Sequence, residues 1–70
     1  MNLTQEGFIL KTKCGYYVAV RSMITVLVTD AFKSTFFDNS DKVVGFQQNY
    51  FEQWGEELEI IPVYRTLQSY

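Results

Sequence analysis

Few residues of this 70-residue chain could do covalent or acid–base chemistry, because it has no histidine and only one cysteine, Cys14. Histidine is the commonest general base, and a cysteine nucleophile needs a base beside it. Asp38 with Asp41, and Glu57 with Glu59, have the spacing of a carboxylate pair. Helix capping explains the first pair and the solvent side of a strand explains the second. The sequence therefore predicts a protein that is not an enzyme, with no cofactor and no metal site.

Four carboxylates cluster where a predicted helix ends: Glu52, Glu56, Glu57 and Glu59. The C-terminus of a helix carries a partial negative charge, so an acidic residue there costs up to about 0.3–1 kcal/mol. Sequences tend to break such local rules where function requires it. We expect these glutamates to form an acidic surface that binds a basic partner protein; the alternative is a solvated surface without a partner.

A second set of residues would suit single-stranded nucleic acid. Tyr16 and Tyr17, with Lys11 and Lys13 close by, could stack bases and contact the phosphate backbone. Against this, the net charge is −2 and only six residues are basic, whereas nucleic-acid binders usually have a basic surface. Nucleic-acid binding is therefore the alternative to protein binding.

The composition favours one small folded domain over residues 1–70. The chain is 47% hydrophobic and 17% aromatic, which supplies a core without a disulfide bond. The sequence shows no secretion signal and no apolar run long enough to cross a membrane, so the expected location is the cytoplasm. Residues 1–35 carry a net charge of +2 and residues 36–70 a net charge of −4.

The first half of the chain has the pattern of a three-stranded meander. Strands are expected over residues 8–12, 16–20 and 23–29, with Gly15 in a tight hairpin between the first two. Residues 30–38 fit either a helical turn or a short strand. Phe36 and Phe37 cannot both face inward from one strand, so one of them is a candidate interface residue.

The second half predicts one helix and a last strand. Asp38, Asn39 and Ser40 are good helix-capping residues, and Gly55 suits the helix C-terminus. Four apolar residues between these ends recur at helical spacing and are expected in the core: Val43, Phe46, Tyr50 and Trp54. Residues 58–64 read as a strand, and because Pro62 cannot donate a hydrogen bond, this strand either lies at a sheet edge or ends at Pro62.

The expected fold is α+β, a small antiparallel sheet in the order β-β-β-α-β with one helix on one face. The opposite face would then be open and apolar, showing residues such as Ile9, Lys11, Tyr16, Val18 and Leu27. Open apolar faces usually mark interfaces, so we expect self-association, most simply as a dimer. A small structural subunit that only self-assembles is a further alternative.

The pattern resembles short accessory proteins of phage and prophage early regions. It comprises Gly15-Tyr16-Tyr17-Val18, a strand ending at Thr29-Asp30-Ala31, a capped aromatic helix, and Leu58-Glu59-Ile60-Ile61-Pro62-Val63. Such proteins commonly bind a host macromolecule, and some, including anti-CRISPR proteins and other host-factor inhibitors, do so with acidic surfaces. The resemblance implies a host-factor inhibitor, and no functional residue is carried over from it.

Overall fold

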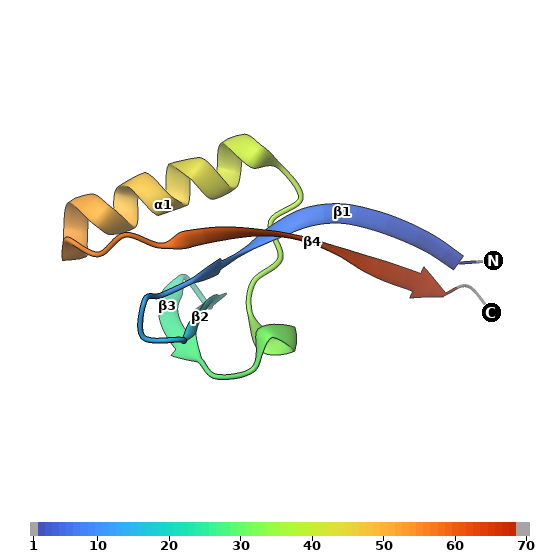
Figure 1. Cartoon of the computed structure of the whole chain (residues 1–70), viewed down its shortest axis with the longest axis horizontal. Coiled ribbons are helices and arrows are strands. Elements are labelled where there is room, and N and C mark those ends of the chain that lie inside the picture. The colour runs from blue at the N-terminus through green and yellow to red at the C-terminus, as the bar shows by residue number, and fades with distance from the viewer. Residues whose placement is uncertain (1, 69–70) are drawn as a thin grey trace.

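Four antiparallel strands and one long helix make up the fold, in a computed structural model that describes residues 2–68 (Figure 1). The α+β class and the element order are as predicted, with one 3-10 turn added. β1 begins six residues earlier than predicted, and β4 extends four residues further. The elements are β1 Asn2–Lys11, β2 Tyr17–Arg21, β3 Ile24–Val28, the 3-10 helix η1 Ala31–Lys33, α1 Ser40–Trp54 and β4 Glu59–Gln68.

The strand order is β3-β2-β1-β4, and β1 and β4 pair along their whole length. The register runs from Asn2 opposite Gln68 to Lys11 opposite Glu59. The outer half of this pair, residues 2–6 with residues 64–68, projects beyond the helix and the other two strands (Figure 1). We call this two-stranded projection the arm. It gives the molecule its elongated extents of 43 × 24 × 23 Å.

Residues 35–37 fill the space where β1 and β2 diverge. β2 pairs with β1 only at Lys11 and Tyr17. Beyond that point Thr35 donates its N–H to Val18 O at 3.1 Å, and Phe37 exchanges two 2.8 Å backbone hydrogen bonds with Phe8. The ambiguous segment 30–38 therefore contains both a helical turn, η1, and a strand-like bridge. It connects the two halves of the sheet.

Phe36 and Phe37 point to opposite faces of the sheet. Phe37 packs against Phe46 of α1, with ring centroids 5.6 Å apart. Phe36 lies over Gly7 on the other face, and the Arg65 guanidinium stands 4.3 Å from its ring centroid. The two phenylalanines thus attach the 30–38 segment to both faces at once.

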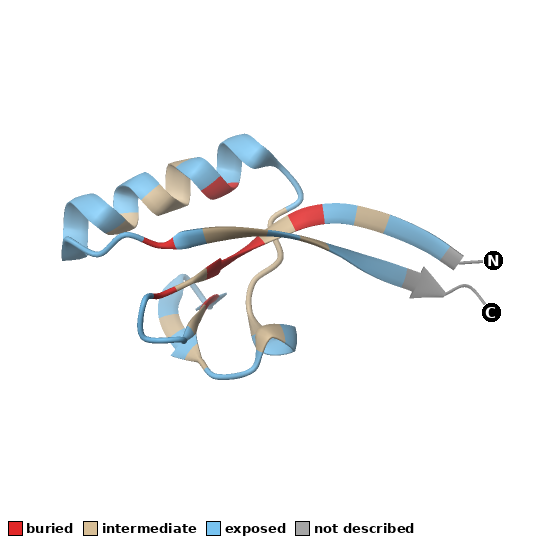
Figure 2. Ribbon diagram, in the orientation of Figure 1, coloured by how far each residue is buried: buried red, intermediate tan, exposed pale blue. Residues whose placement is uncertain are grey.

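The buried core is small and lies where α1 crosses β1 and the start of β4 (Figure 2). Four residues form its centre: Leu10, Val18, Val43 and Leu58. The proposed open face is wrong in its membership, because Val18 is fully buried beneath α1 and Ile9 is buried on the opposite face. η1 and Phe36 line a groove above Ile9, so that second face is partly covered. Of the five residues expected there, Tyr16 and Leu27 are exposed.

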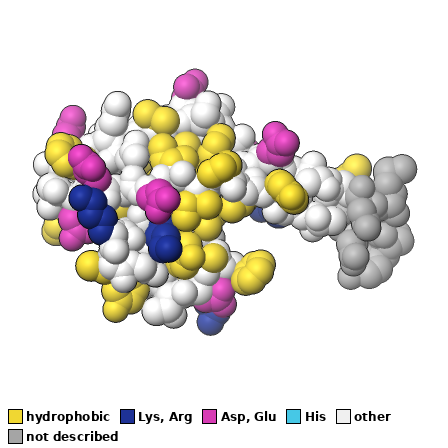
Figure 3. Space-filling model, in the orientation of Figure 1, with side chains coloured by type: hydrophobic (Ala, Val, Ile, Leu, Met, Phe, Trp, Pro, Cys, Tyr) yellow, Lys and Arg dark blue, Asp and Glu magenta, His cyan; other side chains and the backbone are white. Residues whose placement is uncertain are grey.

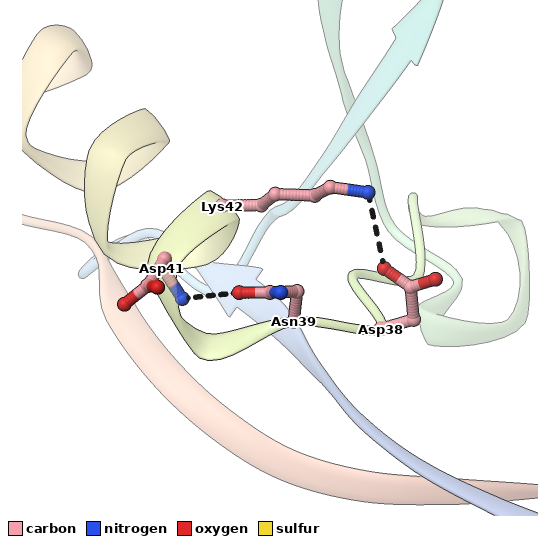
Figure 4. Close-up of polar contacts among 4 residues, drawn as sticks. All are labelled: Asp38, Asn39, Asp41 and Lys42. Carbon is pink, nitrogen blue, oxygen red and sulfur yellow. Dashed lines mark hydrogen bonds and ion pairs between the residues drawn. The ribbon is translucent and has the colours of Figure 1, made fainter.

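Both predicted ends of α1 are confirmed. The Asn39 side chain accepts a hydrogen bond from the Asp41 N–H at 2.7 Å and caps the first turn (Figure 4). Gly55 takes the left-handed conformation, with φ of 70°, and its N–H donates to Phe51 O. This is the usual glycine-terminated helix end.

Pro62 lies on β4, and of the two alternatives the edge position is correct, because β4 is an edge strand that continues past Pro62 to Gln68. It is opposite Phe8, whose backbone N–H and C=O both bond to Phe37 on the other side of β1. The pair of Phe8 and Pro62 is therefore not hydrogen-bonded, and the missing N–H of proline costs no bond between β1 and β4. Within residues 2–68 no helix is long and apolar enough to cross a membrane.

Candidate functional site

The C-terminal end of α1 is held against the sheet by two backbone constraints. Gly55 reverses the chain, and the Gln47 side chain donates a 2.7 Å hydrogen bond to Leu58 O. Leu58 itself is buried in the core. The connection from Gly55 to Leu58 is thus fixed at both ends, and it presents Glu56 and Glu57 to solvent.

The hairpin between β1 and β2 lies beside this connection. The buried Thr12 organises the hairpin: its N–H donates to Tyr16 O, and its hydroxyl accepts from the Tyr16 N–H. Gly15, with φ of 94°, supplies the turn, as predicted. Lys13 and Cys14 at the tip share with Glu56 and Glu57 a shallow depression of about 350 Å³.

Exposed aromatic and acidic side chains meet at this end of the molecule. We call the surface the acidic–aromatic end, and it consists of Phe51, Glu52, Trp54, Glu56, Glu57 and Glu59. Phe51 is 48% exposed, and it lines a second depression, of about 560 Å³, with Glu52 and Glu57. The only ion pair among residues 2–68 is Lys42 with Asp38, so none of the four glutamates has a cation within 4 Å.

Trp54 corrects the sequence prediction, which placed it in the core. It is 67% exposed, because the last turn of α1 reaches past the part of the helix that contributes Val43 to the core. Its ring continues a row of neighbouring aromatic rings: Phe46 and Tyr50 are stacked with centroids 6.4 Å apart, and Tyr50 and Trp54 are tilted with centroids 6.3 Å apart. The row begins in the core and ends at the acidic–aromatic end. The regular helical spacing of Trp54 with the core residues gave no sign that its side chain is exposed. The neighbouring glutamates did indicate that the last turn of the helix faces solvent.

The residues proposed for nucleic acid lie at the same end as the glutamates. Lys11 is opposite both Tyr17 and Glu59 in the sheet register, and its ammonium stands 5.8 Å from the Tyr17 ring centroid. Lys13 borders the depressions that contain the glutamates. Basic and acidic side chains therefore mix there (Figure 3), and the surface has more acidic groups than basic ones.

Tyr16 and Tyr17 do not form a joint stacking platform on one strand face. Tyr17 begins β2 and shares a face with Lys11, whereas Tyr16 precedes the strand and is 43% exposed. Neighbouring residues of an extended chain point to opposite sides. The arrangement therefore offers a base one aromatic surface, next to a carboxylate.

The acidic pairs have structural surroundings. The Asp38 carboxylate lies 3.5 Å from the Lys42 ammonium, and the Asp41 side chain points away from it (Figure 4). Glu57 and Glu59 flank the buried Leu58, and both border a depression that includes Lys13. Residues 2–68 contain no group of three or more metal-ligating side chains positioned around one point.

The pKa of one tyrosine, Tyr50, is affected by burial and by the negative charge at this end of the molecule. Burial raises the pKa of the Tyr50 phenol above its ordinary value of 10.0, and the negative charge of Glu56 raises it further. Glu56 thus acts on the row of aromatic rings as well as on solvent, since an anionic neighbour disfavours a second negative charge.

No family model, no curated protein and no solved structure matches this chain.

Proposed function

We propose that this protein is a non-enzymatic protein-binding module whose acidic–aromatic end docks on a basic surface of its partner. The observation that carries this proposal is the pairing of two exposed aromatic side chains, Phe51 and Trp54, with four exposed glutamates that have no cation of residues 2–68 within 4 Å. Protein interfaces typically combine aromatic anchors with a polar rim.

The aromatic residues and the glutamates would contribute to binding in different ways. Trp54 and Phe51 would lose their exposed apolar area on binding and supply most of the affinity. The glutamates would steer a basic partner into position and exclude partners of the wrong charge. The Gln47–Leu58 hydrogen bond and Gly55 preorganise both sets, which lowers the entropy cost of binding.

The resemblance to phage accessory proteins extends the proposal to the kind of partner. We infer a host macromolecule in the cytoplasm, with this chain as its modulator or inhibitor. A basic groove that normally holds nucleic acid would be blocked by an acidic ligand of this kind, which is the mode of action that the resemblance to host-factor inhibitors such as anti-CRISPR proteins implies.

The test begins with capture from bacterial lysate on the immobilised protein, with and without nuclease, followed by identification of the retained protein. Its dissociation constant is then measured by calorimetry with purified components. We expect Glu56→Lys with Glu57→Lys to weaken binding at least about tenfold, while the fold stays equally or more stable because lysine suits a helix C-terminus.

Matched variants separate this proposal from its competitors. Glu6→Lys reverses one glutamate on the arm, at the other end of the molecule, and should leave the affinity unchanged, whereas Glu56→Lys alone should weaken binding. Trp54→Ala should reduce binding without altering net charge. If only nucleic acid is retained, and Lys11→Glu with Lys13→Glu abolishes that retention, nucleic-acid binding replaces the proposal. Equal affinity of the wild type and the Glu56/Glu57 variant would refute it.

A further inference from the structure

One edge of β1 has no strand beside it in the part of the chain that the structure describes. The backbone N–H and C=O of Phe8 point away from β4, since both bond to Phe37. Backbone groups alternate in direction along a strand, so those of Asn2, Thr4 and Glu6 point the same way as those of Phe8. Phe37 covers this edge only at Phe8. The segment Asn2–Glu6, which we call the free edge, is open.

The opposite edge of the arm is less suited to pairing. It belongs to β4, where Arg65 lies within the arm and Pro62, just beyond the arm, faces outward without an N–H to donate. Proline and charged residues are the usual means by which proteins prevent an edge strand from pairing with another chain. The free edge of β1 contains no proline, and its one charged residue is Glu6, at the end next to the rest of the sheet. A twofold pairing of two β4 edges around Thr66 would bring Arg65 of both copies diagonally together, whereas a pairing of two free edges around Thr4 brings no like charges together.

We propose that the free edge pairs antiparallel with the free edge of a second copy, around a twofold axis at Thr4. Thr4 then lies opposite Thr4 of the second copy, and Asn2 opposite its Glu6. All three outward-facing residues of each copy are used, which gives about six inter-chain N–H···O bonds, two for each pair. The two arms join into one sheet with the strand order β4-β1-β1-β4.

The sequence of the free edge favours this register. An axis at Leu3 or Gln5 leaves outward backbone groups of each copy without a partner within the segment. An axis at Glu6 places two carboxylates directly opposite each other and brings Thr4 against Phe8, whose groups are occupied by Phe37. With the axis at Thr4, no like charges are opposed. Leu3 is 56% exposed. In this register it lies directly opposite Gln5 of the second copy and diagonally adjacent to Leu3 of the second copy.

Thr4 and Thr66 provide a matched pair of variants. They are direct partners between β1 and β4, and their N–H groups point to opposite edges of the arm. Thr4→Pro removes an N–H from the free edge, and Thr66→Pro removes one from the β4 edge, while neither breaks a bond between β1 and β4. We expect Thr4→Pro to raise the dimer dissociation constant about 10- to 100-fold. We expect Thr66→Pro to leave it unchanged.

The measurement is sedimentation equilibrium of the full chain over a wide range of concentration, with circular dichroism to verify that each variant is folded. A wild-type protein that remains monomeric at the highest concentration would overturn the proposal. It would also fail if Thr66→Pro dissociated the dimer as strongly as Thr4→Pro did.

A covalent test avoids any dependence on proline. In a Cys14→Ser background, Thr4→Cys would place two cysteines across the axis, with Cα atoms about 5.5 Å apart, within the range that a disulfide spans. Mild oxidation should give a covalent dimer, and Thr66→Cys in the same background should give little. The reverse pattern would refute the assigned edge. Dimerisation is independent of the acidic–aromatic end, so the Thr4→Pro monomer should still bind the partner.

Discussion

Gly7 is the residue at which three parts of the molecule come closest together. A Cβ atom added there would lie 2.3 Å from the Phe36 ring and 2.4 Å from the Phe37 carbonyl oxygen. The carbonyl belongs to the backbone that bridges β1 through Phe8, so it cannot move without breaking that bridge. The contact between the 30–38 segment and the sheet therefore depends on the absence of a side chain at this position.

Gly7→Ala should lower the free energy of unfolding by about 1–3 kcal/mol or more, because the added methyl group forces the bridge apart. Gly45→Ala is the control: a Cβ there meets nothing within 4 Å, and alanine favours a helix interior by about 0.5–1 kcal/mol. Urea denaturation of both variants measures the difference. Equal effects of the two substitutions would contradict the close approach at Gly7.

Tyr50 makes stability depend on pH at the alkaline end. Its pKa is raised in the folded state, by burial first and by Glu56 second, so the unfolded chain loses this proton first as the pH rises. The stabilising contribution is full below pH 10.0 and is lost as the pH rises from there through the higher pKa of the folded state.

Tyr50→Phe should therefore flatten the decline of unfolding free energy above that pH, and Glu56→Gln should flatten it partly. Thermal denaturation at a series of alkaline pH values measures both, with Tyr64→Phe as the control because Tyr64 is exposed on the arm. A decline as steep in Tyr50→Phe as in the wild type would assign it to other groups.

At the scale of elements, the β2–β3 hairpin has an unfavourable turn. Ser22 and Met23 link the paired residues Arg21 and Ile24, and both have positive φ, 51° and 67°. A two-residue turn of this kind prefers Asn-Gly, and each ordinary residue in the left-handed region costs about 1–2 kcal/mol. Met23 is 98% exposed, so no contact offsets its share of this strain.

Ser22→Asn with Met23→Gly should raise the free energy of unfolding by about 1–2 kcal/mol, which corresponds to about 4–8 °C in Tm for each kcal/mol in a domain of this size. Calorimetry at fixed protein concentration measures the shift. The control exchanges the positions, Ser22→Gly with Met23→Asn, and should gain less. A lower Tm in the Asn-Gly variant would show that the tip is held by a contact.

For the whole molecule, the small core limits the stability of the monomer, and the long arm offers a surface through which a second copy could add to it. Only six apolar residues of the described chain are buried, whereas many large apolar side chains remain exposed. A chain of this length usually gains stability from a partner when it has no disulfide or metal. The proposed pairing of the free edges would supply that gain.

The Tm of the wild type should accordingly rise with protein concentration, since a dimer that dissociates on unfolding is stabilised by mass action. The Tm of Thr4→Pro should be independent of concentration, and that of Thr66→Pro should follow the wild type. Scanning fluorimetry over a wide concentration range suffices. A concentration-independent Tm in the wild type would contradict a dimer coupled to folding.

Local sequence determined the ends of α1, the hairpin at Gly15 and the edge position of Pro62. Each depends on a short-range property: the capping amide of Asn39, the left-handed conformation open to glycine at Gly55, and the missing N–H of proline. Such properties act within a few residues, so they can be read from the chain without knowledge of its partners in space.

Tertiary structure alone decided the length of the arm, the faces of the sheet and the composition of the candidate site. Residues 2–6 pair with residues about sixty positions away, and no local pattern announces such a pairing. Val18 proved buried because segment 35–37 and α1 gather beside β1, whereas Trp54 proved exposed because α1 outruns the core. The basic and acidic candidate residues also lie together because of the packing of elements. The chain reverses at Gly15 and again at Gly55, and the two reversals lie beside each other at the same end of the molecule. Burial and proximity are properties of packed elements. The spacing of residues along the chain could therefore indicate the acidic set and the basic set separately, but it could not show that the two sets lie side by side.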